Sequence, residues 1–185
     1  MPKRSEEHLE ARRRQILDGA RVTFARYGYE GATVAKLEEE IGLSRGAIFN
    51  YYPSKYEIFY ALASEQQAEA LEIWQERGFE ALLREIAEEN PEWLGVYLEH
   101  VRHLRTDPEL RARWQNRTPE DDVRARDHMV ELQASGEIRD DVSAETIGKF
   151  LGLLADGIAL QTSAGFPVDL EPMLGLIRDA IAPRK

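Results

Sequence analysis

Hydrophobic side chains recur every three or four residues along most of the chain, which is the spacing of one buried face of an α-helix. In the segment 6–27, for example, Ile16, Ala20 and Phe24 repeat at four-residue steps, and Gly28 follows as a helix-ending residue. No segment shows a convincing alternation of apolar and polar residues with the period of a β-strand. The pattern therefore predicts an all-α protein.

Capping residues divide the next part of the chain into short helices. Thr33 and Ser44 are preferred N-cap residues, and Gly42 between them ends one helix before the next begins. Ser54 and Glu57 have the S-x-x-E spacing of a capping box and open a longer fourth helix. The second and third helices are thus joined by a tight glycine-containing turn, as in a helix-turn-helix. Further helices are expected to begin near Pro91, Pro108, Ser143 and Asp169.

The third helix, roughly residues 44–51, is only two turns long and is not stable alone. Its apolar side can pack on the neighbouring helices, which leaves Arg45, Gly46, Phe49 and Asn50 facing solvent. Exposing an aromatic ring and a glycine does not help stability, but it suits a helix that docks into the major groove of DNA, which is about 12 Å wide. A helix in that groove places its N-terminal residues against base edges.

Side-chain chemistry predicts which groups contact DNA. Arg45 can donate two hydrogen bonds to a guanine edge, and Asn50 can bond adenine. Nearby hydroxyl and ammonium groups, with the backbone N–H groups at the start of the second helix, suit phosphates. The alternative is a helical hairpin whose basic residues are merely solvated. The predicted contacts with double-stranded DNA are Thr33, Lys36, Ser44, Arg45, Gly46, Phe49, Asn50, Tyr51 and Lys55.

The distribution of charge is more informative than its sum. The chain holds 24 basic and 34 acidic residues, a net charge of −10, whereas residues 1–60 hold 10 basic and 9 acidic residues. Residues 41–56 contain no acid at all. An acid-free window in an acidic protein favours the approach of an anionic partner at the third helix.

Composition excludes several classes of function. Cysteine is absent, which removes disulfides, thiolate nucleophiles and cysteine-ligated zinc. The chain also lacks a phosphate-binding glycine loop and an H-E-x-x-H pair, so neither a catalytic residue nor an enzyme activity is predicted. No apolar run approaches the ~18 residues of a membrane span, and the charged N-terminus has no apolar core of a secretory signal. A cytoplasmic protein without a membrane partner is expected.

Residues 28–34 (GYEGATV), then Leu37, then residues 42–55 (GLSRGAIFNYYPSK) resemble the N-terminal domain of the TetR family of transcriptional regulators. The resemblance spans roughly residues 10–60 and includes the spacing, the glycines and the terminal Tyr-x-x-Lys. It implies an all-α homodimer with a small DNA-binding domain and a larger domain that binds a ligand and dimerises. Phe49 departs from the family, which commonly has Tyr there, so Tyr51 is the better candidate for a contact with the DNA backbone.

On this resemblance, residues 1–53 are expected to form the helix-turn-helix DNA-binding domain. Residues 54–185 are expected to form the helical ligand-binding and dimerisation domain. Three glycines in the apolar helix that begins near Ser143, together with the apolar final helix, favour a dimer interface in this second domain.

A further segment, residues 104–114, is similar to the aconitase-repressor branch of the family. This similarity implies a small-molecule effector, namely a carboxylate with a divalent metal. No cofactor is required. The candidate ligand-binding residues are Arg102, His103, Arg126, His128, Asp156 and Asp179. Salt bridges to nearby acids are the alternative explanation for the basic members. Asp156, by contrast, lies in an apolar helix and must find a partner or face a cavity.

His100 and His103 lie three residues apart beside Glu99, a spacing that allows two helical side chains to share a metal ion. Two helical histidines are more often ordinary packing residues, so no protein-held metal site is predicted. The leading hypothesis is a ligand-responsive dimeric repressor that binds a pseudo-palindromic DNA operator through the third helix. The alternative is a helical protein-interaction module without DNA binding.

Overall fold

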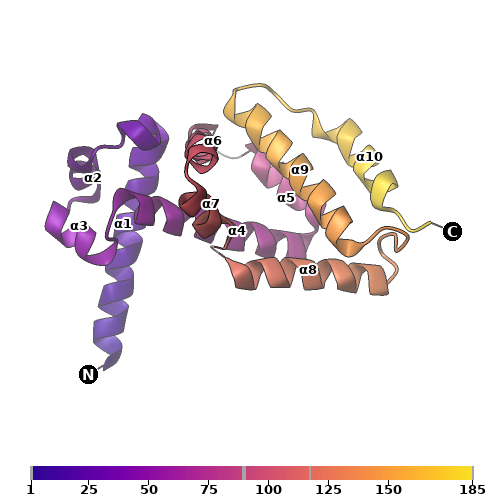
Figure 1. The fold of residues 1–185 in the computed structure, drawn as a ribbon, viewed down its shortest axis with the longest axis horizontal. Helices are drawn as coiled ribbons and strands as arrows, with labels where there is room; N and C mark the ends of the chain where they lie inside the picture. The colour runs from indigo at the N-terminus through magenta and orange to yellow at the C-terminus, as the bar shows by residue number, and fades with distance from the viewer. Residues whose placement is uncertain (1, 89–90, 117, 185) are drawn as a thin grey trace. The chain divides into compact units, whose positions relative to one another are not determined.

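The structure is a computed structural model that describes residues 2–88, 91–116 and 118–184. Over these residues the chain forms ten α-helices and no strand, which confirms the predicted all-α fold (Figure 1). The helices are α1 (Pro2–Gly31), α2 (Val34–Ile41), α3 (Arg45–Tyr51), α4 (Lys55–Arg77), α5 (Phe79–Glu88), α6 (Pro91–Thr106), α7 (Pro108–Gln115), α8 (Pro119–Ala134), α9 (Ala144–Ser163) and α10 (Leu170–Ile181).

The helices belong to two compact units. The N-terminal unit consists of Met1–Gln66 and Gly95–Arg117, and the C-terminal unit consists of Gln67–Leu94 and Thr118–Lys185. Helices α4 and α6 each supply residues to both units. The assignment of residues 1–53 to DNA binding and of residues 54–185 to ligand binding and dimerisation is a functional division, and it stays a prediction.

The predicted caps begin the short helices of the N-terminal unit. The Thr33 hydroxyl accepts a hydrogen bond from the Lys36 amide (3.5 Å) at the start of α2. The Ser44 hydroxyl accepts one from the Ala47 amide (3.3 Å) at the start of α3. Between the two helices Gly42 has a φ of 72°, a backbone conformation in which a side chain would be strained. Local side-chain chemistry therefore determines the turn of the helix-turn-helix.

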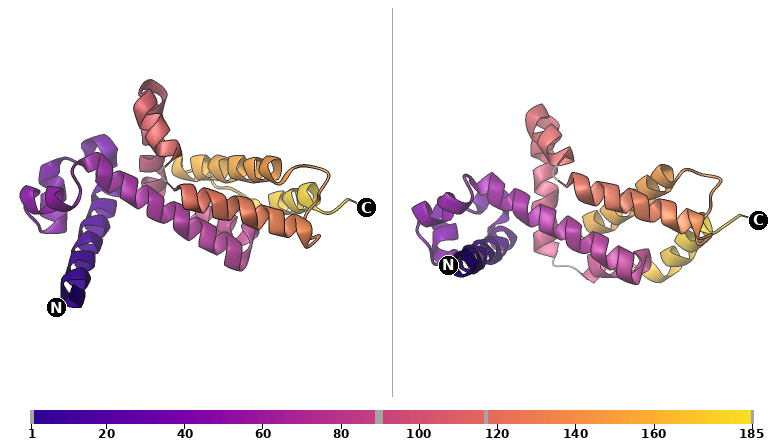
Figure 2. Two further views of the ribbon diagram at one scale, coloured as in Figure 1. Left: turned by 60° about the horizontal axis from the view of Figure 1, so that its bottom comes forward. Right: turned by 90° about the horizontal axis from the view of Figure 1, so that it is seen from below.

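Helix α1 breaks where the sequence predicts its end. Gly28 has a φ of 68° inside α1, so the regular helix stops there and a short turn continues to Gly31. The Ala32 amide donates to the Gly28 carbonyl (3.1 Å) across this turn. Within the N-terminal unit, the first turns of α1 project beyond α2 and α3 (Figures 1 and 2).

Apolar side chains from the first four helices meet in the core of the N-terminal unit. Each helix contributes a side chain that is fully buried: Phe24, Leu37, Ile48 and Phe59. Close packing of α1 on α2 depends on Gly19, because a Cβ atom at this position would lie 2.7 Å from Cγ1 of Ile41. The short α3 is held by the burial of Ile48, as its sequence pattern predicts.

Helix α7 belongs to this unit and packs on α4. The Trp114 ring stacks on Phe59, with ring centres 5.9 Å apart and an interplanar angle of 13°. The Arg113 guanidinium donates to the Glu57 carboxylate (2.6 Å), and the Tyr60 hydroxyl donates to the Arg113 carbonyl (3.2 Å). These contacts make α7 part of the same packed body as the helix-turn-helix.

In the C-terminal unit, α9 packs on α5 and α8, and α10 packs on α5 (Figures 1 and 2). Its buried cluster includes Leu83, Met129, Ile147, Leu151 and Leu174. Large apolar side chains also stay exposed on α9, on α10 and in the loop between them: Phe150, Leu153, Leu160, Phe166 and Leu176. None of the described helices combines the length and the apolar character needed to cross a membrane.

Candidate nucleic-acid interface

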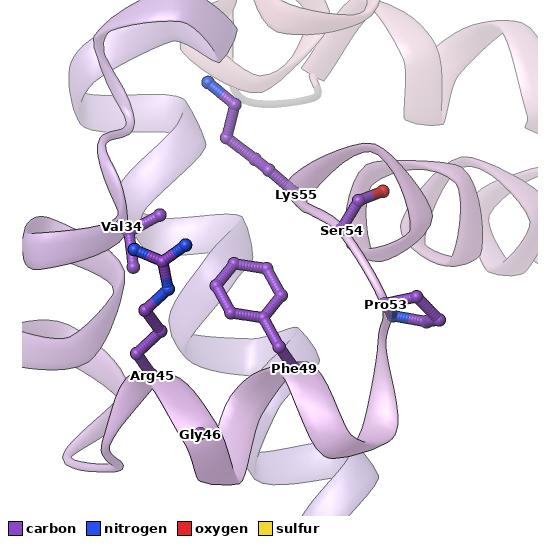
Figure 3. Close-up of a pocket in the computed structure, with 7 residues that line it drawn as sticks. All are labelled: Val34, Arg45, Gly46, Phe49, Pro53, Ser54 and Lys55. Atoms are coloured by element: carbon purple, nitrogen blue, oxygen red, sulfur yellow. The ribbon is translucent and has the colours of Figure 1, made fainter.

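A pocket of about 530 Å³ lies beside α3 on the surface of the N-terminal unit (Figure 3). It is formed by the start of α2, the outer side of α3 and the turn into α4. Its lining residues are Val34, Arg45, Gly46, Phe49, Pro53, Ser54 and Lys55. Both charged residues of this lining are basic. The pocket therefore offers cations and apolar surface, but no acid, to an approaching partner.

Arg45 is exposed at the first position of α3. Its guanidinium carbon lies 5.7 Å from the centre of the Phe49 ring, and Figure 3 shows the two groups side by side in the pocket. The main-chain N–H of Arg45 donates to the Glu38 carboxylate (2.5 Å), so α2 anchors the start of α3. The backbone of Arg45 is fixed while its side chain extends from the surface.

Gly46 and Asn50 extend the exposed side of α3. A Cβ atom at Gly46 would have nothing within 4 Å, so the main chain is open to close approach there. Asn50 is exposed, whereas Phe49 and Tyr51 are half-buried. The structure thus places the four predicted groove-facing residues on one accessible surface, and their contact with DNA stays a prediction.

The two predicted phosphate-binding lysines have internal partners. The Lys36 ammonium donates to the Gly31 carbonyl (3.0 Å), and the Lys55 ammonium donates to the Tyr29 carbonyl (2.7 Å). Burial lowers the pKa of Lys55, and the neighbouring Glu30 acts in the opposite direction. Both lysines therefore hold the turn that leads into α2, a role that the sequence reasoning missed because it depends on tertiary contacts.

Gly42, Ser44 and Gly46 share the G-x-S-x-G spacing of a hydrolase nucleophile elbow. Such an elbow requires a strand before the serine and a helix after it. Here α2 precedes the turn, and the Ser44 hydroxyl is engaged as the N-cap of α3. The spacing belongs to a helix-turn-helix.

A second pocket, of about 570 Å³, lies among α4, α8 and α9 in the C-terminal unit. Of the predicted ligand-binding residues, Arg126 lines this pocket. His128 packs edge-on against Trp74 of the lining, with ring centres 5.2 Å apart. Lys149 also lines the pocket and donates to the Glu145 carboxylate (2.6 Å). The sequence reasoning missed Lys149, because only the packing of three helices places it in one pocket with Arg126.

Neither Asp156 nor Asp179 belongs to the lining of this pocket. Asp156 and Asp179 are exposed on α9 and α10. Asp156 lies on the same side of α9 as the exposed Leu153 and Leu160. The side chains of Arg102 and His103 lie outside the described residues. A role in ligand binding stays a prediction for all four.

His100 is a packed aromatic residue of the N-terminal unit. Its ring is 1% exposed and lies 4.7 Å from the centre of Phe59 and 4.8 Å from that of Trp114. Over the residues that the structure describes, no three His, Asp or Glu side chains are grouped to hold a metal ion. Packing therefore accounts for the position of this histidine.

A glycine turn between two short helices, with an exposed arginine on the second, defines a helix-turn-helix regulator of transcription. Residues 16–62 match the family described as "Bacterial regulatory proteins, tetR family". The chain is 39% identical over 184 residues to the HTH-type transcriptional repressor Rv1474c of Mycobacterium tuberculosis, with 98% of each chain covered. It is 38% identical over 184 residues to the HTH-type transcriptional repressor AcnR of Corynebacterium diphtheriae, with 98% of this chain and 97% of the relative covered. The chain therefore belongs to the TetR family.

Solved structures of regulators share the fold. Salmonella enterica GusR matches with a TM-score of 0.72 at 19% identity, over 92% of this chain and 93% of that chain. Bacillus subtilis FadR, solved in complex with stearoyl-CoA, matches with a TM-score of 0.63 at 20% identity, over 89% and 95%. These matches confirm the predicted arrangement of an N-terminal helix-turn-helix and a larger helical part.

The predicted family is thus confirmed, and with it the predicted class of function. The protein is a DNA-binding transcriptional repressor rather than an enzyme. The alternative, a helical interaction module without DNA binding, is not favoured.

Proposed function

We propose that the protein is a ligand-responsive, homodimeric repressor that binds a pseudo-palindromic operator through α3. The observation that carries the proposal is the exposed Arg45 at the start of α3, beside a pocket whose charged lining residues are both basic. In a dimer, two such helices about 34–36 Å apart meet successive major grooves of one duplex. The location that we propose for this repressor is the cytoplasm.

We assign base contacts to Arg45 and Asn50 and phosphate contacts to the groups around them. Arg45 binds guanine through two N–H groups, and Asn50 binds adenine. The open main chain at Gly46 allows α3 to approach the bases closely. Tyr51 and Thr33 supply hydroxyl groups to phosphates. Lys36 and Lys55 act first by holding the turn before α2, whose N–H groups then face the DNA backbone.

Replacement of Arg45 by alanine tests this assignment. Arg45→Ala should cost about 1–3 kcal/mol of operator-binding free energy and relax base preference at one position of each half-site. The measurement is selection of bound duplexes from random DNA, followed by fluorescence anisotropy on the selected operator. Arg111→Ala, an exposed arginine on α7, is the matched control and should bind as the wild type does. Unchanged affinity and unchanged base preference in Arg45→Ala would contradict the proposal.

The dimer is proposed to form through α9 and α10. The side chains of Leu153 and Leu176 are 72% and 71% exposed in the single chain. Large apolar side chains gathered on adjacent helices mark a protein interface, because their hydration is unfavourable. A second copy of the chain covers this surface in the proposed assembly.

The effector is proposed to bind in the pocket among α4, α8 and α9. Two cations, Arg126 and Lys149, line it together with two acids, Asp122 and Glu145, and Lys149 is paired with Glu145. Arg126 is therefore the group that we assign to a carboxylate of the effector. A divalent metal is proposed to arrive bound to the carboxylate. The effector changes operator affinity by binding differently to the DNA-bound and free conformations.

Thermal unfolding with citrate as the carboxylate probe, with and without magnesium, tests the effector site. Binding to the folded state raises Tm by mass action, so citrate should stabilise the wild type and stabilise Arg126→Ala less. Arg84→Ala, an exposed arginine outside the pocket lining, should respond as the wild type does. Equal responses of all three proteins would contradict the assignment of this pocket.

A further inference from the structure

Phe49 occupies a place on α3 that stability alone does not explain. Its ring is half-buried and forms a wall of the pocket beside α3, where Val34 and Pro53 supply further apolar surface (Figure 3). The same side of the helix carries the polar groups assigned to base contacts. An apolar surface left open there is unfavourable to hydrate, so it is expected to be covered when α3 binds DNA.

Arg45 and Phe49 lie four residues apart on α3, so they share one face about 6 Å apart along the helix axis. The guanidinium carbon lies 5.7 Å from the ring centre. A ring at this position attracts the guanidinium and limits the conformations that it adopts. Base pairs are stacked about 3.4 Å apart. Two side chains with this separation therefore face base pairs that are neighbours or next neighbours.

The major groove presents one apolar group at base edges, the C5-methyl group of thymine. We propose that Phe49 determines part of the operator sequence by contacting the C5-methyl group of a thymine next to the guanine that Arg45 binds. The inference rests on the proposed function, because it requires α3 in the major groove. It assigns the methyl group of a thymine as the ligand of the apolar wall of the pocket.

Replacement of thymine by deoxyuridine deletes only this methyl group and leaves the protein unchanged. The operator is selected from random duplexes with the wild-type protein, and each thymine is then replaced singly. One thymine in each half-site, beside the guanine identified with Arg45→Ala, should contribute about fourfold in affinity, the value of one buried methyl group. Replacing both symmetry-related thymines should cost roughly fifteenfold, because separate positions are nearly additive.

Substitutions of Phe49 test whether its ring causes the difference in affinity between thymine and deoxyuridine. Phe49→Ala should bind more weakly than the wild type and should not distinguish thymine from deoxyuridine at this position. Phe49→Tyr keeps the ring and should keep the fourfold difference. Asn50→Ala, a neighbouring exposed position on α3, is the control, and it should bind more weakly while retaining the methyl dependence.

Equal binding of the wild type to every deoxyuridine operator would overturn the inference. So would methyl dependence that persists in Phe49→Ala, or a selected operator with no thymine within two base pairs of that guanine. Failure of the wild type to select any DNA would overturn the proposed function itself. The two failures are therefore distinguishable.

Discussion

The N-terminal and C-terminal units differ in the chemistry that each exposes. The N-terminal unit carries 15 basic and 13 acidic residues, whereas the C-terminal unit carries 9 basic and 21 acidic residues. The first exposes a pocket with two cations in its lining, and the second exposes large apolar side chains on α9 and α10. A net charge of −10 for the whole chain therefore does not describe either surface.

Charge therefore has to be assigned to a unit before it is used to infer a partner. Duplex DNA carries about one negative charge per 1.7 Å of its axis, so acids near α3 would oppose binding. The chain instead concentrates its acids in the unit to which we assign dimerisation and effector binding. This separation keeps the protein acidic overall, while residues 41–56, which include α3, contain no acid.

The largest expected effect comes from a charge placed on the apolar surface of the C-terminal unit. Leu153→Glu should make the protein monomeric in light scattering, because a carboxylate is costly to bury in an apolar interface. A monomer binds one half-site at a time. In a dimer, binding of one subunit holds the other subunit near the second half-site. Loss of this effect should lower operator affinity by a factor on the order of 10² to 10⁴.

Val130→Glu is the control for this prediction. Val130 is 52% exposed but lies on α8, outside the proposed interface. This variant should stay dimeric and keep its operator affinity. A dimeric Leu153→Glu protein would show that α9 does not form the interface and would remove the contrast between the two units.

A smaller effect is expected at Gly46, where stability and DNA binding should change in opposite directions. Gly46→Ala should stabilise the exposed helix by about 1 kcal/mol, because alanine has the higher helix propensity. Its methyl group would separate α3 from the bases, so operator affinity should fall about tenfold. Gly19→Ala is the contrast, since a clash with the buried Ile41 should cost about 1–3 kcal/mol of folding free energy. Undiminished operator affinity in Gly46→Ala would contradict close approach at this glycine.

The smallest effect concerns Tyr29, whose carbonyl binds Lys55. Burial raises the pKa of Tyr29 to about 12, and the charges of Glu30 and Tyr56 add to the shift. Because the folded state holds the proton more tightly than the unfolded state, this group stabilises the fold below about pH 10. That contribution is lost as the pH rises towards 12. Urea unfolding between these values should show a shallower pH dependence for Tyr29→Phe, and an identical slope would contradict the shift.

The helix-turn-helix is the part of the fold that the sequence predicts best. Thr33, Gly42 and Ser44 determine its boundaries through contacts within four residues, and such local contacts leave a clear pattern in the sequence. The same locality explains the exposure of Arg45 and Asn50, because the burial of Ile48 fixes which side of α3 faces outward.

Contacts between distant residues are the part that the sequence does not reveal. Lys55 binds the carbonyl of Tyr29, 26 positions earlier, so the role of its ammonium group depends on how α4 meets the end of α1. Asp156 is a second example, because its apolar neighbours do not show that it lies on the exposed side of α9. Helix α9 has apolar residues on two sides, and only the side that includes Leu151 and Ile158 is buried.

Helix α7 affects which residues must be transferred to move DNA specificity from one regulator to another. Because Trp114 stacks on Phe59, the packed body that holds α3 draws on two separate stretches of chain. A hybrid repressor that received only residues 1–53 from this protein would contain the recognition helix but not the α4 and α7 residues that complete its packed body. Grafting Met1–Gln66 together with Gly95–Arg117 would carry the whole body, whereas stepwise substitution on α3 would need no graft at all.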